Sequence, residues 1–166
     1  MNDSERKYLI DNQNARESLT GHMVSSVPHV KTLGIELVSI ERNSAKGKLP
    51  YQENLIGNIE NGALHNGALI SLIDTIAGLA VLCALPEYEM IATLDLRLDS
   101  FKPSVSGKDV YATAECYKLT RTIAFVNGSI FQDTPDDPLA SCVATFFRTG
   151  RKTTTFDIGK DDNERA

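Results

Sequence analysis

The sequence predicts an α+β domain in which an antiparallel sheet wraps around one long, buried helix. Residues 66–85 are apolar on almost every helical face, and segments with strand periodicity lie before and after them. A helix that is apolar all round must be covered on most sides, and a sheet is the natural cover. The 166 residues are enough for one such domain with a core of ordinary size.

The central helix is recognised by its spacing and by its end. Its apolar residues recur every three or four positions, and Pro86 stops it. One face carries Leu69, Leu72, Ile73, Ile76 and Ala80. The stretch 62–85 is also long enough to be checked as a membrane span, but it contains Asp74. A carboxylate at mid-span costs about 2.5–3.5 kcal/mol, so we expect a helix buried in protein.

The remaining segments read as strands. Residues 34–50 predict a β-hairpin that turns at Arg42-Asn43-Ser44, and residues 52–62 predict a loop. After the helix, Leu94, Leu96 and Leu98 alternate strictly with polar residues over 93–99. Further strands are expected at 110–119, 123–131 and 139–148, the last two joined by a turn at 133–138.

Three regions follow from this pattern. Residues 1–27 predict a helical extension on the surface, broken near Thr20-Gly21. Residues 28–150 predict the sheet-and-helix domain, and residues 151–166 predict a flexible polar tail. Pro28 and Gly34 are expected to punctuate the entry to the first strand. The polar N-terminus has no apolar stretch typical of a signal peptide, and three scattered cysteines suit a reducing cytoplasm.

Charge and ligand spacing exclude several classes of function. The net charge is −5, which argues against nucleic acid as a partner because phosphate backbones require a basic face. The three histidines and three cysteines show no metal-ligand spacing. We therefore expect chemistry without a metal or another cofactor.

The start of the central helix is a candidate oxyanion site. The first amides of a helix lack intrahelical partners and carry partial positive charge. Gly67 has no side chain to block the approach to its amide, so a developing oxyanion could be bound there. The alternative is an ordinary capped helix start, with His65 or Asn66 near the cap.

Asp74 is the only charged residue between Gly62 and Leu85. Burying a carboxylate costs several kcal/mol unless the group is paired or hydrogen-bonded. Asp74 lies on a short polar stripe with Ser71 and Thr75. Asp74 is therefore either catalytic, or it makes a buried structural hydrogen bond, or it lies in a notch that water fills.

The spacing of Gly67 and Asp74 bears on how they could cooperate. Seven residues of helix separate them by about 10 Å along the axis, whereas reacting atoms must come within about 3–3.5 Å. If both act on one substrate, they come from different subunits of a two-fold dimer. The small residues Ala77, Gly78 and Ala80 suggest helices packed side by side in that dimer.

Residues 55–150 resemble the hotdog-fold acyl-CoA thioesterases of the phenylacetyl-CoA thioesterase (PaaI) type. The matching segments are His65 to Ala68 with Asp74 nine residues after the histidine, Thr93 to Arg97, Phe101 to Pro103, Ala114 to Tyr117, Thr122 to Val126 and Ala144 to Phe146. The resemblance implies a hotdog fold, in which an antiparallel sheet wraps around one long helix. It also implies an acyl-CoA substrate.

The resemblance also implies roles for individual residues. Asp74 would be the general base or the nucleophile, and the Gly67 amide would polarise the thioester carbonyl with His65 supporting the loop. Thr93 stands where the family often has a residue that holds the attacking water. Asn58, or alternatively Asn61, would help to place that water or the substrate.

This chain has Asn66 where the family more often has a glycine, which adds bulk beside the substrate. Arg97, Lys102 and Arg121 are candidates for binding the phosphates of CoA, since guanidinium and ammonium groups pair well with phosphate; the alternative is ordinary surface charge.

The predicted function is hydrolysis of an acyl-CoA to an acid and free CoA. We expect a cytoplasmic enzyme whose minimal unit is a homodimer, assembled as a dimer of dimers into a homotetramer, with no membrane partner. Two alternatives remain open: a hotdog hydratase or dehydratase, and a non-catalytic protein that binds or senses acyl-CoA.

Overall fold

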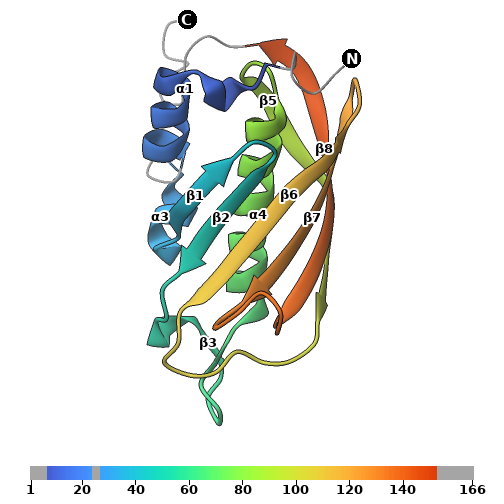
Figure 1. The fold of residues 1–166 in the computed structure, drawn as a ribbon. Coiled ribbons are helices and arrows are strands. Elements are labelled where there is room, and N and C mark those ends of the chain that lie inside the picture. The colour runs from blue at the N-terminus through green and yellow to red at the C-terminus, as the bar shows by residue number, and fades with distance from the viewer. Residues whose placement is uncertain (1–6, 24–26, 153–166) are drawn as a thin grey trace, which may run out of the picture.

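A six-stranded antiparallel sheet curls around one long helix (Figure 1), which confirms the predicted α+β architecture. The computed structural model describes residues 7–23 and 27–152. In spatial order the strands are β1 (Glu36–Glu41), β2 (Ser44–Leu49), β6 (Val110–Leu119), β7 (Ile123–Phe131), β8 (Ala140–Lys152) and β5 (Glu89–Ser100).

Helix α4 (Asn66–Ala84) packs into the concave face of this sheet. Two strand glycines allow the close approach. A Cβ atom at Gly47 would lie 2.2 Å from Cδ1 of Ile76, and one at Gly128 would lie 2.8 Å from Cδ1 of Ile73. The helix is long and apolar enough to cross a membrane, but 67% of that stretch is buried inside the protein. The sheet provides the cover that its sequence requires.

The N-terminal segment is more broken and more buried than the sequence predicts. Instead of one interrupted surface helix, it forms a 3-10 turn η2 (Leu9–Asp11), helix α1 (Gln13–Ser18) and a π-helical turn η3 (Leu19–Met23). Its apolar residues Tyr8, Ile10 and Leu19 are buried in the core. The remainder of the predicted extension, 1–6 and 24–26, and residues 153–166 of the predicted tail lie outside the described residues.

A short helix, α3 (Pro28–Leu33), stands where strand entry was expected. Proline in the first turn and glycine just after the last turn favour a helix, because the proline lacks an amide that would be unpaired there. Gly34 adopts a φ of +70°, the left-handed conformation that ends a helix. Pro28 and Gly34 therefore delimit a helix.

The two edges of the sheet differ. At the β1 edge, Arg16 of α1 donates to the carbonyl of Ile40, and Arg42 pairs with Asp11 at 3.0 Å. Figure 1 shows α1 and α3 on this side of the molecule. At the other edge, no strand of the described part of the chain pairs with the outer side of β5. An unpaired strand of 12 residues is a template for another strand.

The segment predicted as a loop at 52–62 carries regular structure. It contains a 3-10 turn η4 (Glu53–Leu55) and strand β3 (Ile56–Asn58), which pairs with β4 (Ala63–Leu64). The backbone amide of Leu64 donates to the buried hydroxyl of Ser104 at 2.8 Å. This bond holds the small hairpin against the chain that follows β5.

Strand β5 does not alternate strictly. Thr93 pairs with Phe146 and Asp95 with Thr145, so Leu94 is an extra residue in a β-bulge. Leu94 is 58% exposed, in contrast to the half-buried Leu96 and Leu98. The bulge therefore lets Thr93 face the helix while the leucines that follow also face the core.

The small residues of α4 do not form a surface for a partner helix. Ala77 and Ala80 are fully buried inside the chain, and Gly78 faces the side chains of Ile91 and Phe146. The predicted dimer contact through these three residues is therefore wrong, since they are covered by the protein's own sheet.

Glu89 of β5 and Arg148 of β8 form an ion pair in which the side chains are only 9% and 17% exposed. We expect Arg148→Ala to lower the free energy of unfolding by about 3–5 kcal/mol, because it leaves a buried carboxylate without a partner. Urea denaturation measures the loss. Lys108→Ala is the control, because its pair with Asp133 is exposed and is expected to contribute less than about 1 kcal/mol. Equal losses of unfolding free energy in Arg148→Ala and Lys108→Ala would contradict a stabilising role for the buried pair of Glu89 and Arg148.

Candidate active site

Asp74 and Thr93 meet where α4 faces β5. The Thr93 hydroxyl donates to Oδ1 of Asp74 at 2.9 Å. Asp74 is half-buried and Thr93 is exposed, so the pair is open to solvent. The second carboxylate oxygen, Oδ2, has no hydrogen bond to any described residue. It can accept a proton from a bound water.

Cys142 of β8 lies close enough to Asp74 to interact with its charge. Burial raises the pKa of the Cys142 thiol to about 11, and the Asp74 carboxylate adds to the rise. A thiol with this pKa stays protonated near neutral pH and is a poor nucleophile. Cys142 is therefore a poor candidate nucleophile, and Asp74 stays the candidate reactive group at this point of the structure.

The start of α4 is capped by a side chain. His65 is the N-cap residue, and its Nδ1 accepts a hydrogen bond from the Gly67 amide at 3.0 Å. In this arrangement the Gly67 amide points at the imidazole. The amide of Asn66, at the first helical position, has no hydrogen bond to any of the described residues. It is the donor at this helix start that is ready for a ligand.

A cavity of about 280 Å³ gathers many of the predicted residues beside the helix start. The predicted residues that line it are Asn58, Asn61, His65, Asn66 and Lys102. The carboxamide oxygens of both loop asparagines are already used, since Asn58 accepts from the Glu60 amide and Asn61 from the Ala63 amide, each at 3.0 Å.

Asp74 and Thr93 do not line this cavity. Eight residues of helix, or about 12 Å, separate Asp74 from the Asn66 amide. One chain therefore keeps two candidate half-sites apart, a carboxylate at mid-helix and an amide donor at the helix start.

The three predicted phosphate-binding cations do not converge. Asp99 pairs with Arg97 at 2.6 Å, and this contact raises the pKa of the guanidinium. Lys102 pairs with Asp137. Arg121, exposed in the turn between β6 and β7, has no ion pair within the described residues.

His29 reaches the candidate site although no feature of the sequence marks it. Its Nε2 lies 3.1 Å from the hydroxyl of Ser71, which itself donates to the carbonyl of Gly67 at 3.0 Å. Because the serine proton is used there, the imidazole is the donor. Ser71 lies between Gly67 and Asp74 on one face of α4, so α3 reaches the candidate site. No signal in the sequence links residues that are 42 positions apart.

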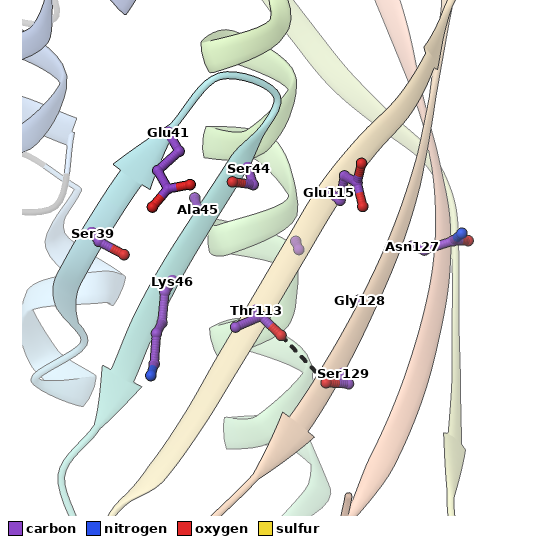
Figure 2. Close-up of a pocket in the computed structure, with 11 residues that line it drawn as sticks. Ser39, Glu41, Ser44, Ala45, Lys46, Thr113, Glu115, Asn127, Gly128 and Ser129 are labelled. Carbon is purple, nitrogen blue, oxygen red and sulfur yellow. Dashed lines mark hydrogen bonds between the residues drawn. The ribbon is translucent and has the colours of Figure 1, made fainter. Parts of the chain in front are cut away.

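A second hollow, of about 440 Å³, lies on the face of the sheet turned away from α4 (Figure 2). It is lined mainly by polar and charged side chains, among them Thr113 and Ser129, whose hydroxyls are 3.3 Å apart. It contains none of the predicted site residues. No group of three or more metal-ligating side chains occurs in 7–23 or 27–152.

Comparison with known proteins identifies the family. The family model of the thioesterase superfamily matches residues 61–139. The Halobacterium salinarum protein named "Putative esterase VNG_1336C" is 30% identical over 133 residues, and the match covers 78% of this chain and 83% of that protein. The medium/long-chain acyl-CoA thioesterase YigI of Escherichia coli K12 is 28% identical over 142 residues, covering 77% of this chain and 90% of the relative.

Solved structures agree. A Pseudomonas aeruginosa protein is 37% identical with a TM-score of 0.72, and the match covers 79% of this chain and 97% of that one. The Escherichia coli PaaI protein is 19% identical with a TM-score of 0.69, covering 80% and 93% of the two chains, and this likeness concerns the fold. The chain therefore belongs to the thioesterase superfamily, has the hotdog fold and is a thioester hydrolase.

Proposed function

We propose that this protein hydrolyses acyl-CoA thioesters with Asp74 as its base. The observation that carries the proposal is the solvent-accessible Asp74 carboxylate, with one oxygen held by Thr93 and the other open. The relative named a medium/long-chain acyl-CoA thioesterase supports this class of substrate.

In the proposed reaction, Oδ2 of Asp74 removes a proton from a water molecule while the oxygen of that water attacks the thioester carbonyl carbon. The carbon–sulfur bond then breaks, and the proton passes from Asp74 to the CoA sulfur. The products are a carboxylic acid and free CoA. Direct attack by Asp74 is the alternative route, through an anhydride that water later hydrolyses. Thr93 keeps the carboxylate oriented in both routes.

The oxyanion that forms on the carbonyl oxygen needs a hydrogen-bond donor. The Asn66 amide meets this need at once, and the Gly67 amide joins it when the His65 imidazole turns away. The Asn66 amide is fixed before the reaction begins, so it needs no reorganisation as charge develops. A hydratase, by contrast, would need the His65 ring as a base paired with an acid, and no carboxylate in the described residues bonds to His65.

We propose that the two half-sites are completed by a two-fold dimer, because one helix holds them too far apart. The open β5 edge provides a surface for pairing with β5 of a second copy. A two-fold axis that brings Gly67 of one α4 opposite Asp74 of the other passes between Ile70 and Ser71. Ile70 is 42% exposed and would be covered there. Each dimer would then have two shared sites.

The phosphates of CoA require cations near the site. Of the three predicted cations, Arg121 alone lacks a carboxylate partner in the described structure, so a phosphate would not have to displace one. Arg97 and Lys102 would have to exchange Asp99 and Asp137 for a phosphate.

Asp74→Asn is expected to lower kcat/KM for acyl-CoA by about 10²–10⁴-fold, because the amide cannot take a proton. The variant should remain folded, since Asn can still accept from Thr93. Asp95→Asn is the control, because the Asp95 carboxylate is exposed on β5, the strand that carries Thr93. A thiol-detection assay measures CoA release. Full activity in Asp74→Asn would contradict the mechanism, and a wild type that binds acyl-CoA without turnover would favour a sensing protein.

Asn66→Pro tests the oxyanion donor, because it removes one backbone N–H. Proline is well tolerated at the first helical position, and the extended conformation of His65 (φ −66°, ψ 135°) suits a residue before proline. We expect kcat to fall about 10²–10³-fold with helix content unchanged by circular dichroism. Asn66→Ala retains the amide and should lose far less. If the two variants behave alike, the Asn66 amide is not the donor.

Subunits of Asp74→Asn and Asn66→Pro, co-expressed with different tags, should complement each other. In a mixed dimer with shared sites, one site carries both substitutions and the other carries neither. The purified mixed dimer should regain roughly half of the wild-type rate, with one of its two sites intact. If it stays as inactive as the parent variants, each site belongs to a single chain.

A further inference from the structure

The cavity beside the start of α4 is lined by polar side chains that present hydrogen-bond donors. The carboxamide oxygens of its two asparagines are held by the backbone, since the Glu60 amide donates to Asn58 and the Ala63 amide donates to Asn61. An amide N–H bonds to the oxygen of a carboxamide and not to its NH₂ group, so these bonds fix the orientation of both side chains. Their Nδ2 groups have no hydrogen bond to any described residue and remain as donors.

His65 and Ser104, which also line the cavity, are used in the same way. Nδ1 of His65 accepts from the Gly67 amide, so the neutral imidazole carries its proton on Nε2. The hydroxyl oxygen of Ser104, a residue that is 6% exposed, accepts from the Leu64 amide, and its own proton has no acceptor among the described residues. A buried donor without an acceptor costs free energy. The Ser104 hydroxyl therefore needs an oxygen from water or from a ligand.

The charge of the lining has one sign. Lys102 contributes an ammonium group, and no Asp, Glu or Arg of the described residues lines the cavity. Lys102 also pairs with Asp137, whose side chain is 73% exposed. An exposed pair of this kind contributes little to stability, so the ammonium group is free to bind a ligand. The buried residues Leu69 and Leu139 add an apolar wall. The cavity therefore combines a cation and several donors with a surface for methylene groups.

We propose that this cavity binds a carboxylate at the far end of a short acyl group, so that the substrate is the CoA thioester of a dicarboxylic acid. The inference rests on the proposed function, which places the thioester carbonyl at the amide of Asn66, a residue of the same lining. An ionised carboxylate only accepts hydrogen bonds, and a cation strengthens those bonds. It therefore matches a wall that offers donors and Lys102.

The size of the cavity favours the acyl side of the substrate over the CoA side. Its volume of about 280 Å³ is near the lower limit of small-molecule sites, which is about 300 Å³. Because Asn66 and Lys102 line one small space, an anion bound by Lys102 lies only a few bonds from the thioester carbonyl. The long pantetheine arm keeps the phosphates of CoA much further from the sulfur. A short acyl chain with a terminal carboxylate spans the required distance.

Pairs of thioesters with equal carbon number test the end group: glutaryl-CoA against pentanoyl-CoA, and adipoyl-CoA against hexanoyl-CoA. The wild-type kcat/KM should be about tenfold higher or more for the carboxylate member of each pair, as expected for hydrogen bonds to a charged group. Lys102→Met should lower this ratio about tenfold, because it removes the cation and keeps the length of the side chain. Asn61→Asp should lower it as well, since its carboxylate still accepts from the Ala63 amide but repels the ligand.

Lys108→Met is the matched control, because Lys108 also pairs with an exposed aspartate, Asp133, and does not line the cavity. Its ratios should equal those of the wild type. An active wild type without a preference for the carboxylate members would overturn this inference and leave the proposed function intact. Equal losses for both members of a pair in Lys102→Met would do the same, since the lysine would then serve the CoA portion. A wild type that hydrolyses neither these four thioesters nor hexadecanoyl-CoA would overturn the proposed function, and the inference with it.

Discussion

The fixed rise of α4 is the constraint on which the rest of the structure depends. At about 1.5 Å per residue, a straight helix keeps Asp74 about 10–12 Å from the amides at its own start. The hydrogen bond from Gly67 to His65, and that from Thr93 to Asp74, show that each half-site is organised separately. Thioester hydrolysis needs a base and an oxyanion donor within reach of one carbonyl, and for this reason we propose that a second copy supplies one of the two.

The sheet determines which side of α4 can take part. Gly47 and Gly128 let the strands lie directly on the helix, and this contact buries most of its faces. The N-terminal segment covers the β1 edge, whereas none of the described strands pairs with the outer edge of β5, beside Asp74. The bulge at Leu94 turns Thr93 toward the carboxylate without removing the following leucines from the core. The way the sheet wraps α4 therefore determines both the packing of the core and the exposure of the candidate site.

Much of this fold could be predicted from residue patterns. The bounds of β6 and β7 agree with the predicted ones, and those of α4 differ by one residue at its end. These elements are predictable because apolar periodicity is a local property of the sequence. The bulge in β5 could not be predicted, since the leucines alternate in sequence whether or not the strand does. Helix α3 has a proline in its first turn and Gly34 just after its last, and the same two residue types also punctuate the entry to a strand, so a segment of six residues does not distinguish the two.

The sequence could point to candidate residues for the site but not to their contacts. Asp74 stood out because a lone carboxylate on an apolar helix needs a reason. Its bond to Thr93 spans 19 positions and that of His29 to Ser71 spans 42, so both depend on tertiary packing. A crystal structure with an acyl-CoA analogue that carries a methylene group between sulfur and carbonyl tests the shared site most directly. The account predicts the carbonyl oxygen at the start of one α4 and the carbonyl carbon beside Asp74 of the partner subunit; both contacts from one chain would contradict it.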